Sequence, residues 1–287
     1  METVRRWSVE QVLDNPLQTG EAGKAVGLRA ATGEVVAFID SDNFLVGSDW
    51  LRRMVAPFRD PRVVSSEPLR WAYGRDQSYV DRYCALTGVN DPASLFVGNY
   101  GRYSHLTRKW TGFPVEVEQA AGYLRVRVDP DLLPTMGANG YLVRVAPMLS
   151  VVTGEYLFDI DAVGELARAG FDVVARVDTE IGHAFAAGYG DFVRKTQRRA
   201  RDYLYYSALG RRTYPWVRYR FGLARFAIAT ILVIPPLVQA AIGYSRRADR
   251  AWWFHPVACW TTLVVYVFET LRAPLRRERL SRHRWRQ

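Results

Sequence analysis

The chain has 287 residues, 49% of them hydrophobic, enough for one large domain or a domain with an appendage. Its 39 basic residues outnumber its 29 acidic ones, and all but Lys24, Lys109 and Lys195 are arginine. With only two cysteines, the sequence excludes a disulfide framework and a cysteine metal site. It also lacks a zinc-finger spacing and an aromatic-basic RNA-binding motif, which argues against a nucleic-acid partner.

The first 30 residues are mixed and polar, and Gly20, Gly23 and Gly27 predict a flexible approach to the first clear strand. That strand is an apolar run over residues 35–39. A β-branched run without a polar break predicts a strand buried on both faces, as in a parallel sheet.

Two carboxylates, Asp40 and Asp42, follow this run directly. Open α/β sheets bind ligands at the carboxyl ends of their strands. Carboxylates two residues apart can both face a hard cation such as Mg²⁺ or Mn²⁺, which in turn holds substrate phosphates. The alternative is an ordinary turn, because Asp, Ser and Asn are turn formers.

A helix is predicted next, since Ser48 can cap a segment with one apolar face. That face is made of Trp50, Leu51, Met54, Val55 and Phe58. A short strand is expected over residues 63–66, a helix over 75–88, and irregular structure from there to residue 115.

The following elements alternate between strand and helix. Apolar and arginine side chains alternate over residues 124–128, which predicts a half-exposed strand, and a second strand is expected over 141–145. A helix over 159–169, closed by Gly170, precedes a strand over 171–177. Strands that alternate with helices indicate the α/β class.

Two apolar segments, residues 221–243 and 251–271, are each about the ~20 residues needed to cross a bilayer. Arginines cluster before the first and after the second, so the positive-inside rule places both ends in the cytoplasm and the linking loop on the far side. The alternatives are two buried core helices, or a re-entrant or interfacial hairpin. A Pro-Pro pair and Arg225 support a re-entrant or interfacial course for the first segment, while two spans remain the prediction.

Several short motifs follow one another in a definite order. Gly-Lys-Ala at residues 23–25 precedes Ala-Thr-Gly-Glu at 31–34, the apolar strand and Asp-Ser-Asp-Asn at 40–43. This order resembles the nucleotide-sugar half of an inverting family-2 glycosyltransferase, which has the GT-A fold.

Later residues continue the resemblance. Gly-Ala-Asn-Gly-Tyr at 137–141 resembles the acceptor-side loop, Phe-Asp-Ile-Asp at 158–161 the segment with the catalytic base, and His183 the late histidine of these enzymes. The match covers roughly residues 15–205.

The resemblance implies a domain organisation. Residues 1–205 would form a GT-A-like (Rossmann-like) catalytic domain, a mixed sheet flanked by helices and short at its N-terminus. Residues 206–287 would form a membrane-associated region with the two apolar helices and a basic tail.

The resemblance also implies a metal site and a base. Asp40 and Asp42 would hold Mn²⁺ or Mg²⁺, with Asp42 the firmer ligand, and His183 would complete the shell unless it is an ordinary histidine. A base must deprotonate the acceptor hydroxyl. Asp159 aligns with the usual base, and Asp161 is a close rival; either could instead cap the helix that follows.

Substrate contacts are implied at several further positions. Lys24 and Asp40 would face the nucleotide or its phosphates, and Gly137 and Asn139 the acceptor, although turn chemistry explains an Asn-Gly pair equally well. Lys195 and Arg198 stand where related enzymes place basic residues near the pyrophosphate. The usual Gln-x-x-Arg-Trp is absent, which favours a solvated or lipid-facing basic stretch instead.

The function implied is a glycosyltransferase at the cytoplasmic side of the cell membrane. It would transfer a sugar, with inversion, from a nucleotide-diphosphate sugar to a lipid-linked or polysaccharide acceptor. The family normally places a strand, a turn, a helix and a second strand before the region of Lys24. Only 23 residues precede it here, so a truncated or inactive membrane partner protein is the alternative. An unrelated membrane-attached α/β protein is a third possibility.

Overall fold

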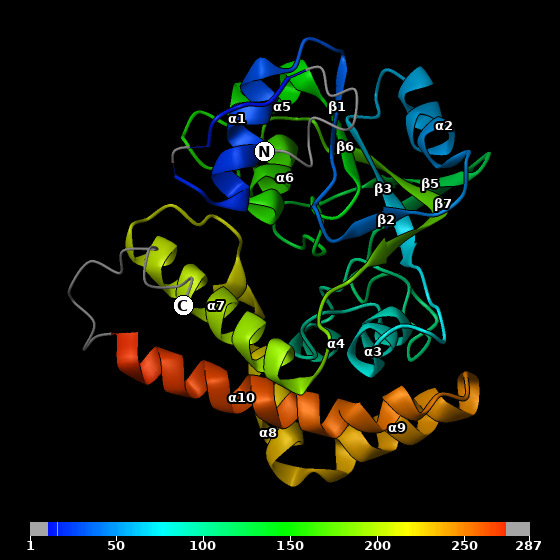
Figure 1. Cartoon of the computed structure of the whole chain (residues 1–287), viewed down its shortest axis with the longest axis vertical. Coiled ribbons are helices and arrows are strands. Elements are labelled where there is room, and N and C mark those ends of the chain that lie inside the picture. Colours follow the sequence, from blue (N-terminus) through cyan, green and yellow to red (C-terminus); the bar gives the residue numbers. More distant parts are fainter. Residues whose placement is uncertain (1–10, 16, 274–287) are drawn as a thin grey trace.

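The computed structural model describes residues 11–15 and 17–273 as a mixed sheet with flanking helices and a C-terminal group of apolar helices (Figure 1). The strands are β1 (Val35–Phe38), β2 (Asn43–Leu45), β3 (Ser65–Trp71), β4 (Glu116–Ala120), β5 (Tyr123–Arg127), β6 (Tyr141–Arg144) and β7 (Val173–His183). The helices that accompany them are α1 (Gly20–Ala30), α2 (Trp50–Val55), the 3-10 helix η2 (Ala56–Arg59), α3 (Tyr79–Thr87), α4 (Ala93–Val97), α5 (Val145–Val151) and α6 (Asp159–Arg168). The C-terminal helices are α7 (Tyr189–Ala208), η3 (Trp216–Tyr219), α8 (Arg220–Leu232), α9 (Ile234–Arg246), η4 (Arg250–Phe254) and α10 (His255–Arg272). The predicted α/β class and mixed sheet are confirmed, and the domain boundary predicted after residue 205 falls inside α7.

The strand order is β1-β6-β3-β7-β5-β4, with β2 paired to β7. β3 and β7 run parallel, and the other pairings among the described strands are antiparallel. β1 pairs only with β6 in the described part of the chain, and Ala37 on it is exposed. The predicted strand exists, but its placement in the interior of a parallel sheet is wrong, because it lies at an edge.

The glycine-rich approach to β1 is a helix rather than the flexible segment predicted. Thr19 caps α1 by accepting a hydrogen bond from the backbone of Ala22, and Ala22, Ala25 and Leu28 are buried. A side-chain cap and a buried face offset the low helix propensity of glycine.

The helix predicted after Ser48 exists as α2, but it begins one residue later than that cap implies and its apolar face is narrower. Trp50 and Met54 are buried, whereas Leu51 is 56% exposed and Val55 43% exposed. Its N-cap is Asp49, without a side-chain bond, so the predicted capping by Ser48 is wrong.

Several other predicted elements are confirmed with changed bounds. The strands predicted at 63–66 and 171–177 become the longer β3 and β7, and the helix predicted at 75–88 is α3. The strands expected at 124–128 and 141–145 are β5 and β6. Gly170 follows α6 with a φ of +89°, the left-handed conformation that commonly ends a helix.

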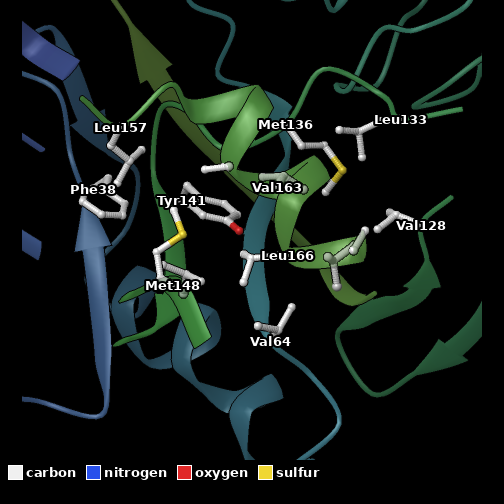
Figure 2. Packing of buried hydrophobic residues seen from close by; sticks show 14 of the residues in the cluster. Phe38, Val64, Val128, Leu133, Met136, Tyr141, Met148, Leu157, Val163 and Leu166 are labelled. Atoms are coloured by element: carbon white, nitrogen blue, oxygen red, sulfur yellow. The ribbon is translucent and has the colours of Figure 1, made fainter. Parts of the chain in front are cut away.

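The core beneath α6 fixes the position of the candidate site. Val163 and Leu166 of α6 pack with Tyr141 of β6, Met148 of α5 and Val64, all buried (Figure 2). Burial of large apolar side chains stabilises this contact by about 1.5–3 kcal/mol each. The start of α6, with Asp159, is therefore held firmly against the sheet.

The first apolar segment is broken. α8 and α9 meet at 91° around Val233, whose φ is +63°. The Pro-Pro pair lies in the first turn of α9, where a missing N–H is tolerated, and proline cannot continue the preceding helix. Arg250–Arg272 is the one continuous helix in the described residues long and apolar enough to cross a membrane, and α8 with α9 would qualify only as a bent pair.

The loop between α9 and η4 packs against the sheet unit, which is the sheet together with helices α1 to α6. Arg82 of α3 donates to Asp249 at 3.0 Å, and the guanidinium of Arg247 lies over the ring of Tyr73. In this structure the loop therefore contacts α3 and Tyr73, and its predicted placement on the far side of a membrane stays a prediction. The basic tail predicted after residue 273 lies outside the described residues.

Candidate functional site

A cavity of about 1200 Å³ opens between α1, the end of β1 and α7. Most of the residues predicted as site residues line it: Lys24, Asp40, Asp42, Asn139, Asp159, His183, Lys195 and Arg198. They come from segments far apart in the sequence, so the fold itself gathers them.

Lys24 lies at the centre of a carboxylate cluster. Its Nζ is 3.1 Å from Asp40 Oδ1 and 3.0 Å from Asp159 Oδ2. Burial alone would lower the pKa of Lys24, but the charges of Asp159 and Asp40 raise this pKa above its usual value. Lys24 is therefore a fixed cation in the cavity wall rather than a solvated surface lysine.

Asp159 is the first residue of α6. Phe158 occupies the N-cap position, so neither Asp159 nor Asp161 caps the helix. Burial raises the pKa of Asp159 to about 6, against the opposing charge of Lys24. A carboxylate with a pKa near neutral can both accept and release a proton at physiological pH.

Asp161 lies outside the cavity. Its side chain is 7% exposed and accepts hydrogen bonds from Arg212 Nε at 2.8 Å and from the backbone N–H of Tyr214 at 2.9 Å. These bonds fasten the segment after α7 to α6. The structure thus separates two candidates that are only two residues apart.

Asp42 and His183 form a second pair across the cavity. Asp42 Oδ2 lies 3.5 Å from His183 Nε2 and 3.6 Å from Lys195 Nζ. The hydrogen bond from His183 and the charge of Lys195 outweigh burial and lower the pKa of Asp42. The ring of His183 stacks on Trp71, with 4.8 Å between the ring centroids.

The predicted metal ligands are not gathered around one point. Asp40 faces Lys24, whereas Asp42 faces His183. Within residues 11–15 and 17–273, no group of three or more His, Cys, Asp or Glu side chains could hold a metal ion. Asp42 and His183 remain a carboxylate–imidazole pair that could supply two ligands, with substrate oxygens and water supplying the rest.

The Asp-Ser-Asp-Asn segment is a hydrogen-bonded turn that also lines the cavity. The N–H of Asn43 donates to Asp40 O, and Asn43 Nδ2 donates to Asn139 Oδ1 at 2.9 Å. Asn139 has a φ of +60°, so the predicted turn chemistry is present there as well. Both segments serve as turns and as cavity wall at once.

Gly137 does not line the cavity, but it lets its loop approach the start of α6 closely. Its φ is +101°, and a Cβ at this position would lie 2.4 Å from the carbonyl oxygen of Asp159. Glycine is required because any side chain would push the loop away from the start of α6.

Two basic residues of α7 line the same cavity. Lys195 Nζ lies 5.0 Å from the centroid of the Phe185 ring, and Arg198 is exposed at the cavity wall. A smaller cavity of about 300 Å³ shares Asn139 and Asp159 with the large one. Asp159 thus stands where two adjoining spaces meet.

A cluster that the sequence reasoning missed supports the loop over 137–139. Glu67 accepts from the buried Arg102 and Arg176, and also from the N–H of Gly137 at 3.2 Å. Arg102 Nη2 donates to the carbonyl oxygens of Ala138 and Asn139, both at 3.0 Å. Arg176, within the apolar start of β7, could have indicated this cluster in the sequence, because a buried charge requires partners.

The arrangement joins cations, the carboxylates of Asp40, Asp42 and Asp159, and the imidazole of His183 around one polar space. No family model matches this chain, and no curated protein matches its sequence.

Proposed function

We propose that this chain is the catalytic part of a metal-assisted, inverting glycosyltransferase attached to a membrane. The observation that carries the proposal is the gathering of the ordered motifs around one cavity, with Asp159 and Lys24 in contact within it. The resemblance of those motifs to family-2 glycosyltransferases supplies the reaction class. The donor would be a nucleotide-diphosphate sugar, and the acceptor a lipid-linked glycan or a polysaccharide.

Donor binding would rest on the cationic wall. Lys195 and Arg198 face the cavity from α7, and Lys24 faces it from α1. A diphosphate is attracted by fixed positive charges that a partly enclosed site shields from water. Competition between donor phosphates and Asp40 for Lys24 would release Asp40 toward the ribose or the sugar.

Proton transfer would fall to Asp159. The acceptor hydroxyl oxygen forms a bond to the anomeric carbon while the bond from that carbon to the diphosphate oxygen breaks. The hydroxyl proton passes to Asp159, and the electron pair of the broken bond leaves with the nucleoside diphosphate. Attack from the face opposite the leaving group inverts the anomeric carbon. General-base assistance of this kind contributes about 10²–10⁴-fold.

The metal proposal narrows to Asp42 and His183, which would hold Mg²⁺ or Mn²⁺. When bound, the cation would neutralise the charge that develops on the leaving diphosphate. Asp42 suits this role because its lowered pKa keeps it ionised at neutral pH.

A titration tests the donor site. The detergent-solubilised chain is titrated with UDP and with GDP, with and without Mn²⁺, beside Asp42→Ala. Glu116→Ala is the matched control, because that side chain is 83% exposed on β4. We expect Mn²⁺-dependent binding that Asp42→Ala abolishes and Glu116→Ala retains.

Equal binding by Asp42→Ala would overturn the metal assignment. Absence of binding to either nucleotide would favour the second candidate, an inactive partner of another glycosyltransferase. The observation that favours this candidate is the edge of β1, which lines the cavity without a second partner strand in the described residues.

A further inference from the structure

The C-terminal helices carry an apolar face directed away from the sheet. On α10 the exposed side chains follow one helical stripe: Val257, Trp260, Val264, Val267, Phe268 and Leu271. On α8 and α9 the most exposed apolar residues are Phe221, Ile228, Ile231, Leu232 and Ile234. These helices lie together on the side of the molecule remote from the sheet (Figure 1). So large an apolar surface marks an interaction site.

The opposite face of α10 is fastened to the sheet unit and α7 along its length. His255 Nδ1 is 2.8 Å from the hydroxyl of Tyr83, near the start of the helix. Near its end, the carboxylate of Glu269 is 1% exposed and accepts from Arg201 Nη2 at 2.8 Å. Tyr266, between them, donates to Asp91.

These polar contacts decide how α10 can meet a bilayer. A helix that crosses the hydrocarbon core needs to withdraw from the aqueous domain over most of its length. Withdrawal of α10 would take Glu269 away from Arg201 and carry a carboxylate into hydrocarbon, which is costly in a membrane protein.

The loop before η4 is likewise held against the rest of the folded chain. Besides the ion pair between Arg82 and Asp249, Arg247 Nη1 contacts His105 Nε2 at 2.9 Å, and Arg246 donates to the carbonyl oxygen of Leu106. Both ends of α10 are therefore held by contacts with the rest of the folded chain.

The charges on α8, α9 and α10 indicate which kind of surface the apolar face contacts. Between residues 220 and 272 the acidic residues are Asp249 and Glu269, and both are taken up in ion pairs. Arg220, Arg250 and Arg272 are exposed at the margins of the apolar face. Arginines at the rim of an apolar face, with Trp253 half exposed beside them, match the headgroup layer of an anionic bilayer.

We propose that α8, α9 and α10 lie in the plane of an anionic bilayer and anchor the chain from one side without crossing it. This deepens the membrane attachment in the proposed function and rests on it. The bend at Val233 lets the α8–α9 corner enter the lipid while α10 lies between the lipid and the catalytic unit.

Labelling of introduced cysteines tests the topology. Both native cysteines are buried, so the background is low. In the full chain, Ala248→Cys places a thiol in the exposed loop, and Val117→Cys places one on β4, where the side chain is 47% exposed. Each variant is expressed, and inverted membrane vesicles are treated with a membrane-impermeant maleimide, with and without detergent. We expect both thiols to react without detergent. Reaction of the Ala248→Cys thiol only after detergent would overturn the proposal in favour of a spanning hairpin.

Vesicle flotation tests the lipid contact. The double variant V264E/V267E places charges on the exposed stripe, whereas L51E does so at a similarly exposed site on α2. With phosphatidylcholine–phosphatidylglycerol vesicles we expect about a tenfold or greater loss of binding for the double variant and none for L51E. Equal binding by all three proteins would overturn the proposal.

Light scattering tests whether a second copy of the chain, instead of lipid, covers the apolar face. A wild-type dimer in solution that V264E/V267E converts to a monomer would assign the face to a second copy instead of lipid, and would also overturn the proposal. The nucleotide titration in detergent does not involve this face. A failure of the membrane inference is therefore distinguishable from a failure of the donor site.

Discussion

Two clusters of opposite charges lie within the same sheet unit, and they differ in their access to solvent. In the cavity cluster, the side chains of Lys24, Asp159 and Asp40 are 13%, 23% and 33% exposed. In the cluster around Glu67, no side chain is more than 6% exposed. In the cavity cluster one lysine lies between two carboxylates, whereas around Glu67 one carboxylate lies between two arginines. The cavity cluster is the more open to a ligand.

The difference also concerns hydrogen bonds. Arg102 and Arg176 donate to backbone carbonyl oxygens as well as to Glu67, so their charges are embedded in the fold. Lys24 has only side-chain carboxylate partners in the described structure. A partly solvated side-chain partner can be exchanged for a substrate group, whereas a buried backbone partner cannot. The first cluster suits function and the second suits the support of a loop.

The largest effect should come from Asp159→Asn. The amide fills the same space and leaves Lys24 paired to Asp40, so the fold should persist, but no base remains. We expect transfer to fall about 10²–10⁴-fold. The measurement is release of nucleoside diphosphate from the donor that the titration selects. An unchanged rate would show that Asp159 is not the base.

Next in size is Glu67→Gln, which should destabilise the protein by about 3–5 kcal/mol, because two buried guanidinium groups lose their counter-charge. Urea unfolding of the detergent-solubilised chain measures this. Glu116→Gln on exposed β4 is the control and should leave the midpoint unchanged. If Glu67→Gln unfolds at the same urea concentration as wild type, the cluster is not the support that its burial indicates.

A smaller effect is expected from Asp161→Asn, which weakens the bonds to Arg212 and the backbone of Tyr214. The predicted cost is about 1–3 kcal/mol of stability. Transfer per folded molecule should be retained, in contrast with Asp159→Asn. Loss of transfer without loss of stability would exchange the roles of the two residues.

The smallest predicted effect is on pH dependence. A base works only when ionised, and the pKa of Asp159 is about 6, so its carboxylate form dominates above pH 6 and declines below it. The rate should therefore be about half of its plateau at pH 6 and about a tenth of it at pH 5. Initial rates between pH 5 and 8 measure this, with the residual rate of Asp159→Asn as the control that should lack the inflection. A rate that is flat or rises toward pH 5 would contradict the assignment.

Local sequence patterns predicted much of the secondary structure. The helix that begins at Asp159 and ends at Gly170, the alternation along β5 and the break at the Pro-Pro pair all follow from propensity, periodicity and proline geometry, which act within a few residues. The order of short motifs was also enough to nominate most of the residues that line the cavity.

Tertiary structure decided what local patterns could not. Asp159 and Asp161 are equivalent in the sequence, and only the packing of α6 turns the first toward Lys24 and the second toward Arg212. The apolar segments satisfy a length rule for membrane spans, yet Glu269 and Asp249 gain arginine partners more than sixty residues away. Glu67 finds its counter-charges 35 and 109 residues further along the chain. Charge compensation and strand pairing depend on contacts between distant segments, and only the folded chain establishes these contacts.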